Sequence, residues 1–78
     1  MEKDKKFYLV GLRGCELDGY ICSGVRHLTN DWIILECSFC MYSEILNRTW
    51  LQEVKISPKE IERHNQANRM VRKLLGRE

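Results

Sequence analysis

Short apolar runs bounded by turn-forming residues fill the chain from Phe7 to Ile56. Runs that are rich in aromatic and β-branched residues and bounded by Gly, Asn and Asp are typical of β-strands. We expect about four strands, at residues 7–13, 20–28, 32–39 and 49–56. The third begins Trp-Ile-Ile-Leu, which is apolar on both faces, so we expect it to be the central and most buried strand.

Turn-forming residues separate these predicted strands. Asp18-Gly19 predicts a hairpin between the first two, because Gly accepts a positive φ at no steric cost. Thr-Asn-Asp at residues 29–31 predicts the next turn, since Asn and Asp side chains bond to their own backbone. Residues 40–48 fit either one helical turn or an irregular crossing strand.

The C-terminal segment carries the clearest helix signals in the chain. Ser57 fits the N-cap, Pro58 the first helical position and Glu60 the capping box, while Gly76 fits a left-handed stop. Apolar residues recur at helical spacing, and we expect this stripe to cover the sheet. The stripe consists of Ile61, Ala67, Val71, Leu74 and Leu75.

These elements predict one small α+β domain over residues 1–78. It divides into a charged tail at 1–6, a β-meander at 7–56 and a helix at 57–76. Short strands need a cover over one sheet face, and this helix supplies it. We therefore expect a small antiparallel β-meander or an SH3- or Sm-like partial barrel, capped by one C-terminal helix.

Part of the strand region resembles a known family. An apolar strand, Gly19 and then Asn30-Asp31 before Trp-Ile-Ile-Leu resemble the first half of an Sm-type motif, over residues 12–35. In that family the helix precedes the barrel, whereas here it follows the strands. For this reason we transfer none of the family's binding residues to this chain.

Composition places the chain among ordinary globular domains. Of its 78 residues, 44% are apolar and 31% charged. No apolar run approaches the ~20 residues of a membrane span, and no apolar signal-peptide segment follows the charged first six residues. We expect a cytoplasmic protein that does not contact a membrane and whose cysteines are reduced or bound to metal.

The cysteines are the candidate metal ligands. Cys37 and Cys40 have the spacing of a zinc knuckle, and a meander would bring Cys15 and Cys22 to the same end of the sheet. A zinc ion held by all four would stabilise a small core. The alternative is four buried, reduced thiols acting as small hydrophobes. A register slip of one residue would put Cys22 and Cys37 on opposite faces.

Charge is distributed unevenly along the chain. Residues 1–57 hold seven Lys/Arg and eight Asp/Glu, whereas residues 58–78 hold six and three. The basic helix face and its amides could meet phosphates, a base edge, a backbone or a partner protein. The alternative is a solvated polar face. The candidate binding residues are Arg63, Asn65, Asn68, Arg69, Arg72, Lys73 and Arg77, with Tyr42 as an exposed aromatic.

Large rings and apolar side chains are abundant for so small a sheet. Those that share an uncovered face would form a surface for a protein partner or for base stacking. Core packing is the favoured interpretation for Trp32 and Trp50. Residues 41–46, which include Met41 and Tyr42, predict an apolar knob suited to a protein interface.

No arrangement of residues indicates an active site. His27 and His64, the two histidines, have no acid or nucleophile at an informative spacing, so we expect structural roles for both. We expect a non-enzymatic protein-binding or regulatory module: an adaptor, an inhibitor or a self-associating regulator. Small inhibitors encoded by phages and mobile elements are similar in size and composition. The alternative is a nucleic-acid-binding domain that uses the basic helix, and stabilisation by zinc is compatible with either function.

Overall fold

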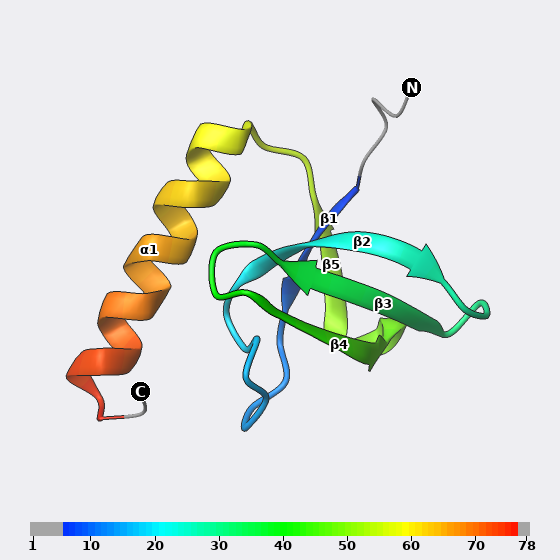
Figure 1. The fold of residues 1–78 in the computed structure, drawn as a ribbon, viewed down its shortest axis with the longest axis horizontal. Helices are drawn as coiled ribbons and strands as arrows, with labels where there is room; N and C mark the ends of the chain where they lie inside the picture. The colour runs from blue at the N-terminus through cyan, green and yellow to red at the C-terminus, as the bar shows by residue number, and fades with distance from the viewer. Residues whose placement is uncertain (1–5, 77–78) are drawn as a thin grey trace.

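The computed structural model describes residues 6–76, so all but the last residue of the charged tail predicted at 1–6 lies outside the described residues. Within this range five antiparallel strands form one open sheet of order β4-β3-β2-β1-β5, with one helix after them (Figure 1). The predicted α+β class is confirmed, and the sheet does not close into a barrel. The elements are β1 (Phe7–Val10), β2 (Ile21–His27), β3 (Trp32–Cys37), β4 (Tyr42–Asn47), the 3₁₀ helix η1 (Arg48–Trp50), β5 (Leu51–Val54) and α1 (Pro58–Leu74).

The fifth strand is β4, in the segment that the sequence left ambiguous. It pairs with β3 along its whole length, from Trp32 opposite Asn47 to Cys37 opposite Tyr42. The predicted last strand is shorter than expected because its first residues form η1. Asn47 caps that turn, since the backbone N–H of Thr49 donates to Asn47 Oδ1 at 3.0 Å.

The connection between β1 and β2 is a folded loop and not the predicted tight hairpin. Residues 11–20 turn back on themselves, and Leu17 within them is fully buried in the core. Gly19 has a φ of 84°, which agrees with the conformational freedom expected at Asp-Gly. This loop is important because the C-terminal helix docks on it.

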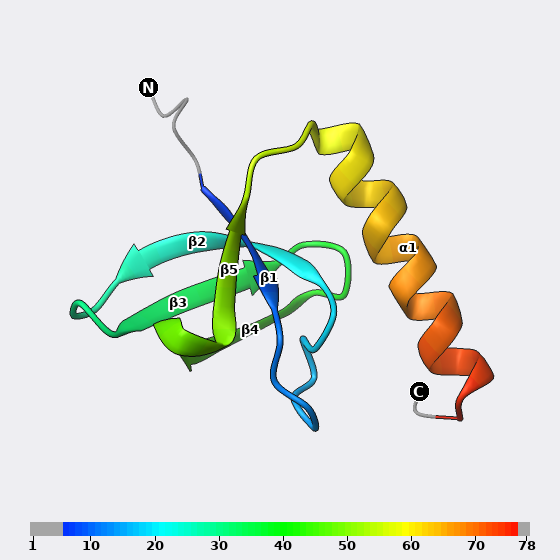
Figure 2. The ribbon, with the colours of Figure 1, turned by 180° about the vertical axis from the view of Figure 1, so that it is seen from behind.

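The sheet is bent around a small core. β1 and β5 cross the β2–β3–β4 part at a steep angle (Figures 1 and 2). The pairing of β2 with β3 shifts register after Gly24, and a Cβ on Gly24 would lie 2.7 Å from the Tyr8 ring. The core consists of Tyr8, Val10, Leu17, Tyr20, Cys22, Ile33, Leu35, Cys37 and Leu46.

The prediction for β3 is correct for one face only. Ile33 and Leu35 are fully buried, but Trp32 at the start of the strand is 40% exposed. The strand is also next to the edge strand β4, and β2 occupies the centre of the sheet. An apolar run on both faces therefore marks one core face and one partly exposed apolar face here.

Helix α1 begins and ends where the sequence predicts. The backbone N–H of Glu60 donates to Ser57 Oγ at 3.3 Å, Pro58 occupies the first turn, and Gly76 has a φ of 73° just beyond the end. The helix lies beside the end of the sheet where β2 starts and β3 ends, not across a sheet face (Figures 1 and 2).

The predicted orientation of α1 is wrong. Of the expected apolar stripe only Ile61 is buried, whereas Val71 is 50%, Leu74 84% and Leu75 64% exposed. The side that faces the rest of the protein continues from Ile61 through four polar residues, described next. The cause is hydrogen bonding to the backbone, which hydrophobic periodicity does not register.

Asn65 is the centre of this polar contact and is 4% exposed. Its Oδ1 accepts from the Ile21 N–H at 2.7 Å, and its Nδ2 donates to the Ile21 carbonyl at 3.1 Å. The register of β2 and β3 places Ile21 beyond Cys37, the last residue of β3, so no described strand is positioned to pair with it on that side. The Asn65 amide takes the place of the missing strand.

Three further side chains of α1 bond to the loop before β2. His64 Nε2 lies 2.8 Å from the Gly19 carbonyl, and Asn68 Nδ2 and Arg72 Nη1 donate to the Asp18 carbonyl at 3.1 and 2.8 Å. The approach is close, since a Cβ on Gly19 would lie 2.5 Å from Asn68 Oδ1. The structural role expected for His64 agrees with this contact. Together these bonds fix the rotation of α1 about its axis.

Replacing Asn65 with Ala leaves the buried N–H and carbonyl of Ile21 unpaired. We expect the free energy of unfolding, measured by urea denaturation, to fall by about 2–4 kcal/mol. The matched control is Gln66→Ala at the neighbouring exposed position, for which we expect a change within about 0.5 kcal/mol. Equal losses for the two variants would show that Asn65 does not hold the helix.

Candidate binding surface on the C-terminal helix

The polar docking of α1 leaves its apolar side facing outward. Met70 is 61% exposed, and Val71, Leu74 and Leu75 are exposed by half or more. Met70, Val71 and Leu74 recur at helical spacing on the side away from Asn65, and Leu75 follows them at the C-cap, so they form one continuous strip. We call this strip the outer stripe; it consists of Ala67, Met70, Val71, Leu74 and Leu75.

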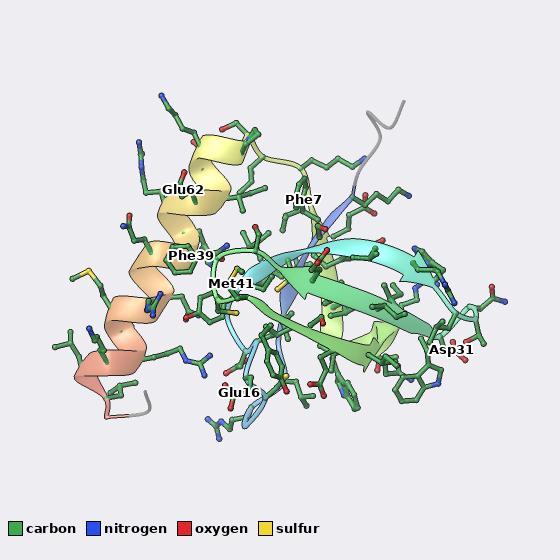
Figure 3. All side chains as sticks on the ribbon, viewed as in Figure 1. Phe7, Glu16, Asp31, Phe39, Met41 and Glu62 are labelled. Carbon is green, nitrogen blue, oxygen red and sulfur yellow. The ribbon has the colours of Figure 1, made fainter. Side chains whose placement is uncertain are left out.

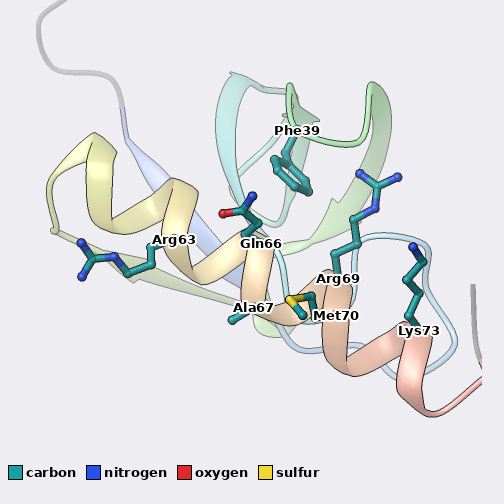
Figure 4. A pocket seen from close by; sticks show the side chains of 7 residues that line it. All are labelled: Phe39, Arg63, Gln66, Ala67, Arg69, Met70 and Lys73. Atoms are coloured by element: carbon teal, nitrogen blue, oxygen red, sulfur yellow. The ribbon is translucent and has the colours of Figure 1, made fainter.

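A groove runs between α1 and the turn that joins β3 to β4. Phe39 extends from that turn toward the helix (Figures 3 and 4), and the groove has a volume of about 490 Å³. The Arg69 guanidinium lies 5.4 Å from the centroid of the Phe39 ring, a cation–π distance. We call this the Phe39 groove; it is lined by Phe39, Arg63, Gln66, Ala67, Arg69, Met70 and Lys73.

The groove and the stripe form a single surface, because Ala67 and Met70 belong to both. Arg63, Arg69 and Lys73 line the groove, and no Asp or Glu is among its lining residues. Along the helix, residues 63–76 hold four Lys/Arg and no acid. The surface is therefore an apolar ridge with a cationic flank, which attracts anionic groups.

The binding residues that the sequence predicts on the helix divide into three groups. Arg63, Arg69 and Lys73 lie together in the Phe39 groove. The second group is bonded within the chain, and we assign its members to helix packing instead of to a binding surface. Arg77 lies outside the described residues. The second group consists of Asn65, Asn68 and Arg72.

Tyr42 is not part of this surface. It lies at the start of β4 and lines a separate shallow pocket with Cys15 and Glu16. Its hydroxyl donates to Glu44 Oε1 at 2.9 Å, and this bond together with the Glu44 charge raises the pKa of Tyr42. Of the predicted apolar knob, Met41 is 85% exposed while Leu46 is buried.

Phe39, Gln66 and Met70 belong to the surface but are not among the binding residues that the sequence predicts, and the other apolar members of the surface are predicted on the core-facing side. Phe39 was placed at the end of a strand, but it lies in the turn after β3, where it reaches the helix. Met70 lies at the spacing of Ala67 and Leu74 and would have joined the apolar stripe on a helical wheel. Periodicity was therefore an available signal for Met70, whereas no local pattern marks Phe39 as a neighbour of the helix.

A second apolar area lies on the outer face of the sheet. Trp32 and Trp50 pack edge to face with centroids 6.3 Å apart, and they are 40% and 38% exposed, so core packing was the wrong prediction for both. Ile34 shares the face of Trp32 by strand alternation and pairs with Ile45, which is 50% exposed. Cations also lie beside this area, since Arg26 is the register partner of Ile34 and Arg48 is in η1 with Trp50.

The four cysteines are free thiols at one end of the sheet and its loops. The register of β2 and β3 places Cys22 opposite Cys37, so both lie on one face of the sheet. There they are buried and hydrogen-bonded to each other. Cys37 Sγ also accepts from the Cys40 N–H at 3.4 Å, while Cys15 Sγ accepts a backbone N–H from within its own loop. Within residues 6–76 no three His, Cys, Asp or Glu side chains form a group suited to a metal ion.

The zinc site therefore stays a prediction, which metal analysis of the purified protein would test. The environments of the thiols differ, and so do the directions in which their pKa values are shifted. Hydrogen bonding from Cys22, opposed by burial and assisted by Cys40, lowers the pKa of Cys37 from 9.0 to about 5. Hydrogen bonding to Cys37 and burial raise the pKa of Cys22, and burial raises the pKa of Cys40 to about 12.

This inequality predicts a pH-dependent stability under reducing conditions. Between pH values of about 5 and 9 the folded state has released the Cys37 proton that the unfolded state still binds, so stability should rise with pH. Above about pH 9 the unfolded state loses protons that Cys22 and Cys40 retain when folded, so stability should fall.

Urea unfolding across this range, for the wild type and for Cys37→Ser, measures the effect. We expect the variant to lose the rise, while Cys15→Ser, a matched change at a partly exposed thiol, keeps it. Parallel stability curves for the wild type and Cys37→Ser would contradict the assignment.

Comparisons with known proteins add no family to this description. No protein-family model, no curated protein and no solved structure matches the chain. No helix within residues 6–76 has both the length and the apolar character that a membrane crossing requires. A function must therefore be argued from the surfaces themselves.

Proposed function

We propose that this chain is a small, non-enzymatic protein-binding module that acts on its partner through the outer stripe of α1. One observation carries the proposal: α1 is held by its polar side, so Met70, Val71 and Leu74 face outward. An amphipathic helix of a monomeric protein ordinarily buries its apolar side. A continuous exposed apolar strip is instead typical of a protein interface.

The energetics support an interface at this position. Complete burial of a Leu, Val or Met side chain contributes about 1.5–3 kcal/mol. The isolated chain does not gain this contribution at Met70, Leu74 or Leu75, because all three are more than half exposed. A partner that covers the stripe gains it, and the helix needs no rearrangement to present these residues.

Two further features fit a regulatory or adaptor role in the cytoplasm. The four cysteines are free thiols, as expected in a reducing compartment. His64, one of the two histidines, contacts the Gly19 carbonyl and helps to hold the helix. A module that binds through one helix is compatible with each of three roles: an adaptor, an inhibitor or a self-associating regulator.

The test compares the double variant Met70→Glu/Leu74→Glu with Val25→Glu, which places the same charge on an exposed apolar residue of the sheet. A partner is recovered with the tagged wild-type protein from its native cells, purified, and titrated against all three proteins by calorimetry. We expect wild type and Val25→Glu to bind alike and the double variant to bind at least about tenfold more weakly.

Circular dichroism checks that each variant is folded. We expect all of them to fold, because the substituted side chains are exposed. A purified partner that binds the double variant as tightly as the wild type would contradict the role of the stripe.

The Phe39 groove supports a second candidate function, the binding of single-stranded nucleic acid. It combines an aromatic ring with three cations, the chemistry that such proteins use for stacking and for phosphate contacts. This candidate is weaker, because it uses the flank of the surface and leaves Leu74 and Leu75 in water.

For this second function we expect oligonucleotide affinity to fall steeply with salt, because each phosphate contact releases counterions. Arg69→Glu and Lys73→Glu should each lower the affinity, whereas Lys55→Glu, at an exposed cation that does not line the groove, should have little effect. Fluorescence anisotropy with a labelled oligonucleotide measures all of these. Absence of binding at about 50 mM salt would exclude the candidate.

A further inference from the structure

We infer that the segment accepted by the outer stripe and the Phe39 groove is an acidic amphipathic helix of another protein. The inference rests on the proposed function and names the chemistry of the partner. Three properties of the described surface lead to it: its length and spacing, its charge, and the position of its apolar residues relative to its cations.

The spacing of the stripe matches another helix. Ala67, Met70 and Leu74 are separated by three and four residues, and Val71 lies beside Met70. Apolar side chains at this spacing interleave with the same pattern on a facing helix. The Phe39 groove runs along the flank of this line and shares Ala67 and Met70 with it, which allows side chains at the edge of such a partner to enter (Figure 4).

The charge selects an acidic partner. Arg63 and Lys73 line the groove at two levels along the helix, and Arg69 lies between them against the Phe39 ring. A partner helix packed on the stripe would bring the side chains at its edge next to these cations. Glu or Asp at those positions gains favourable pairing, whereas Lys or Arg is repelled.

The same charges argue against a second copy as the occupant. Residues 63–76 of a second chain bring four more Lys/Arg and no acid, so pairing of two stripes would place like charges together. A nucleic acid satisfies the cations but offers nothing to the apolar residues. Leu74, which is 84% exposed, and Leu75 would stay in water beside a polyanion. An acidic amphipathic helix is the occupant that uses both properties of the surface.

The experiment uses the full chain and two synthetic model peptides. Both carry Leu at alternating spacings of three and four residues, with Glu at the remaining exposed positions of one peptide and Lys at those of the other. Fluorescence anisotropy measures binding of each peptide, and a labelled single-stranded oligonucleotide competes in a separate titration. Light scattering after size exclusion measures the oligomeric state of the free chain.

We expect the acidic peptide to bind at least about tenfold more tightly than the basic peptide. Leu74→Glu should weaken acidic-peptide binding roughly tenfold through loss of an apolar anchor. Lys73→Glu should weaken it and reduce its salt dependence, whereas the control Val25→Glu should leave it unchanged. These positions are exposed, and circular dichroism verifies the fold of each variant.

Equal binding of the two peptides, or binding of neither, would overturn the inference. A dimer in light scattering that Leu74→Glu converts to a monomer would assign the stripe to a second copy, and displacement of the peptide by the oligonucleotide at much lower concentration would assign it to nucleic acid. The proposed function is tested separately. If a purified native partner still depends on Met70 and Leu74 while the acidic peptide fails, only the partner chemistry is wrong.

Discussion

The hydrogen-bonding demand of one backbone position, Ile21, determines how the C-terminal helix is attached. β3 ends before it can pair with this residue, and both polar groups of the Ile21 peptide would otherwise be buried without partners. The Asn65 amide satisfies both, at 2.7 and 3.1 Å. Leaving a buried N–H or carbonyl unpaired costs more free energy than leaving an apolar side chain exposed to solvent. This contact therefore decides which side of α1 faces inward.

Rings and guanidinium groups connect this attachment to the rest of the surface. Arg72 lies over the Tyr20 ring at 5.3 Å, and Arg69 lies over Phe39 at 5.4 Å. The two rings are themselves neighbours, with centroids 6.1 Å apart. The helix, the loop before β2 and the turn after β3 are therefore packed as one unit. Phe39, which forms one wall of the groove, contacts Arg69 on one side and Tyr20 on the other.

Local signals in the sequence predicted the helix well and its rotation badly. Ser57, Pro58 and Gly76 act on their own neighbours in the chain, so they place the helix ends correctly. The partner of Asn65 is 44 residues away, and no local pattern encodes it. Periodicity likewise identified the apolar residues of α1 but not whether they face the core or the solvent. The cations of the groove were found as a set, whereas Phe39 joins them only through the tertiary fold.

The attachment through Asn65 also makes one peptide group a natural reporter of helix release. The Ile21 N–H is covered by a side chain from α1 and not by a neighbouring strand. Its hydrogen can exchange with deuterium in the solvent once α1 lifts away, even while the strands remain paired. The exchange rate at this amide therefore measures how often the helix leaves the sheet, separately from global unfolding.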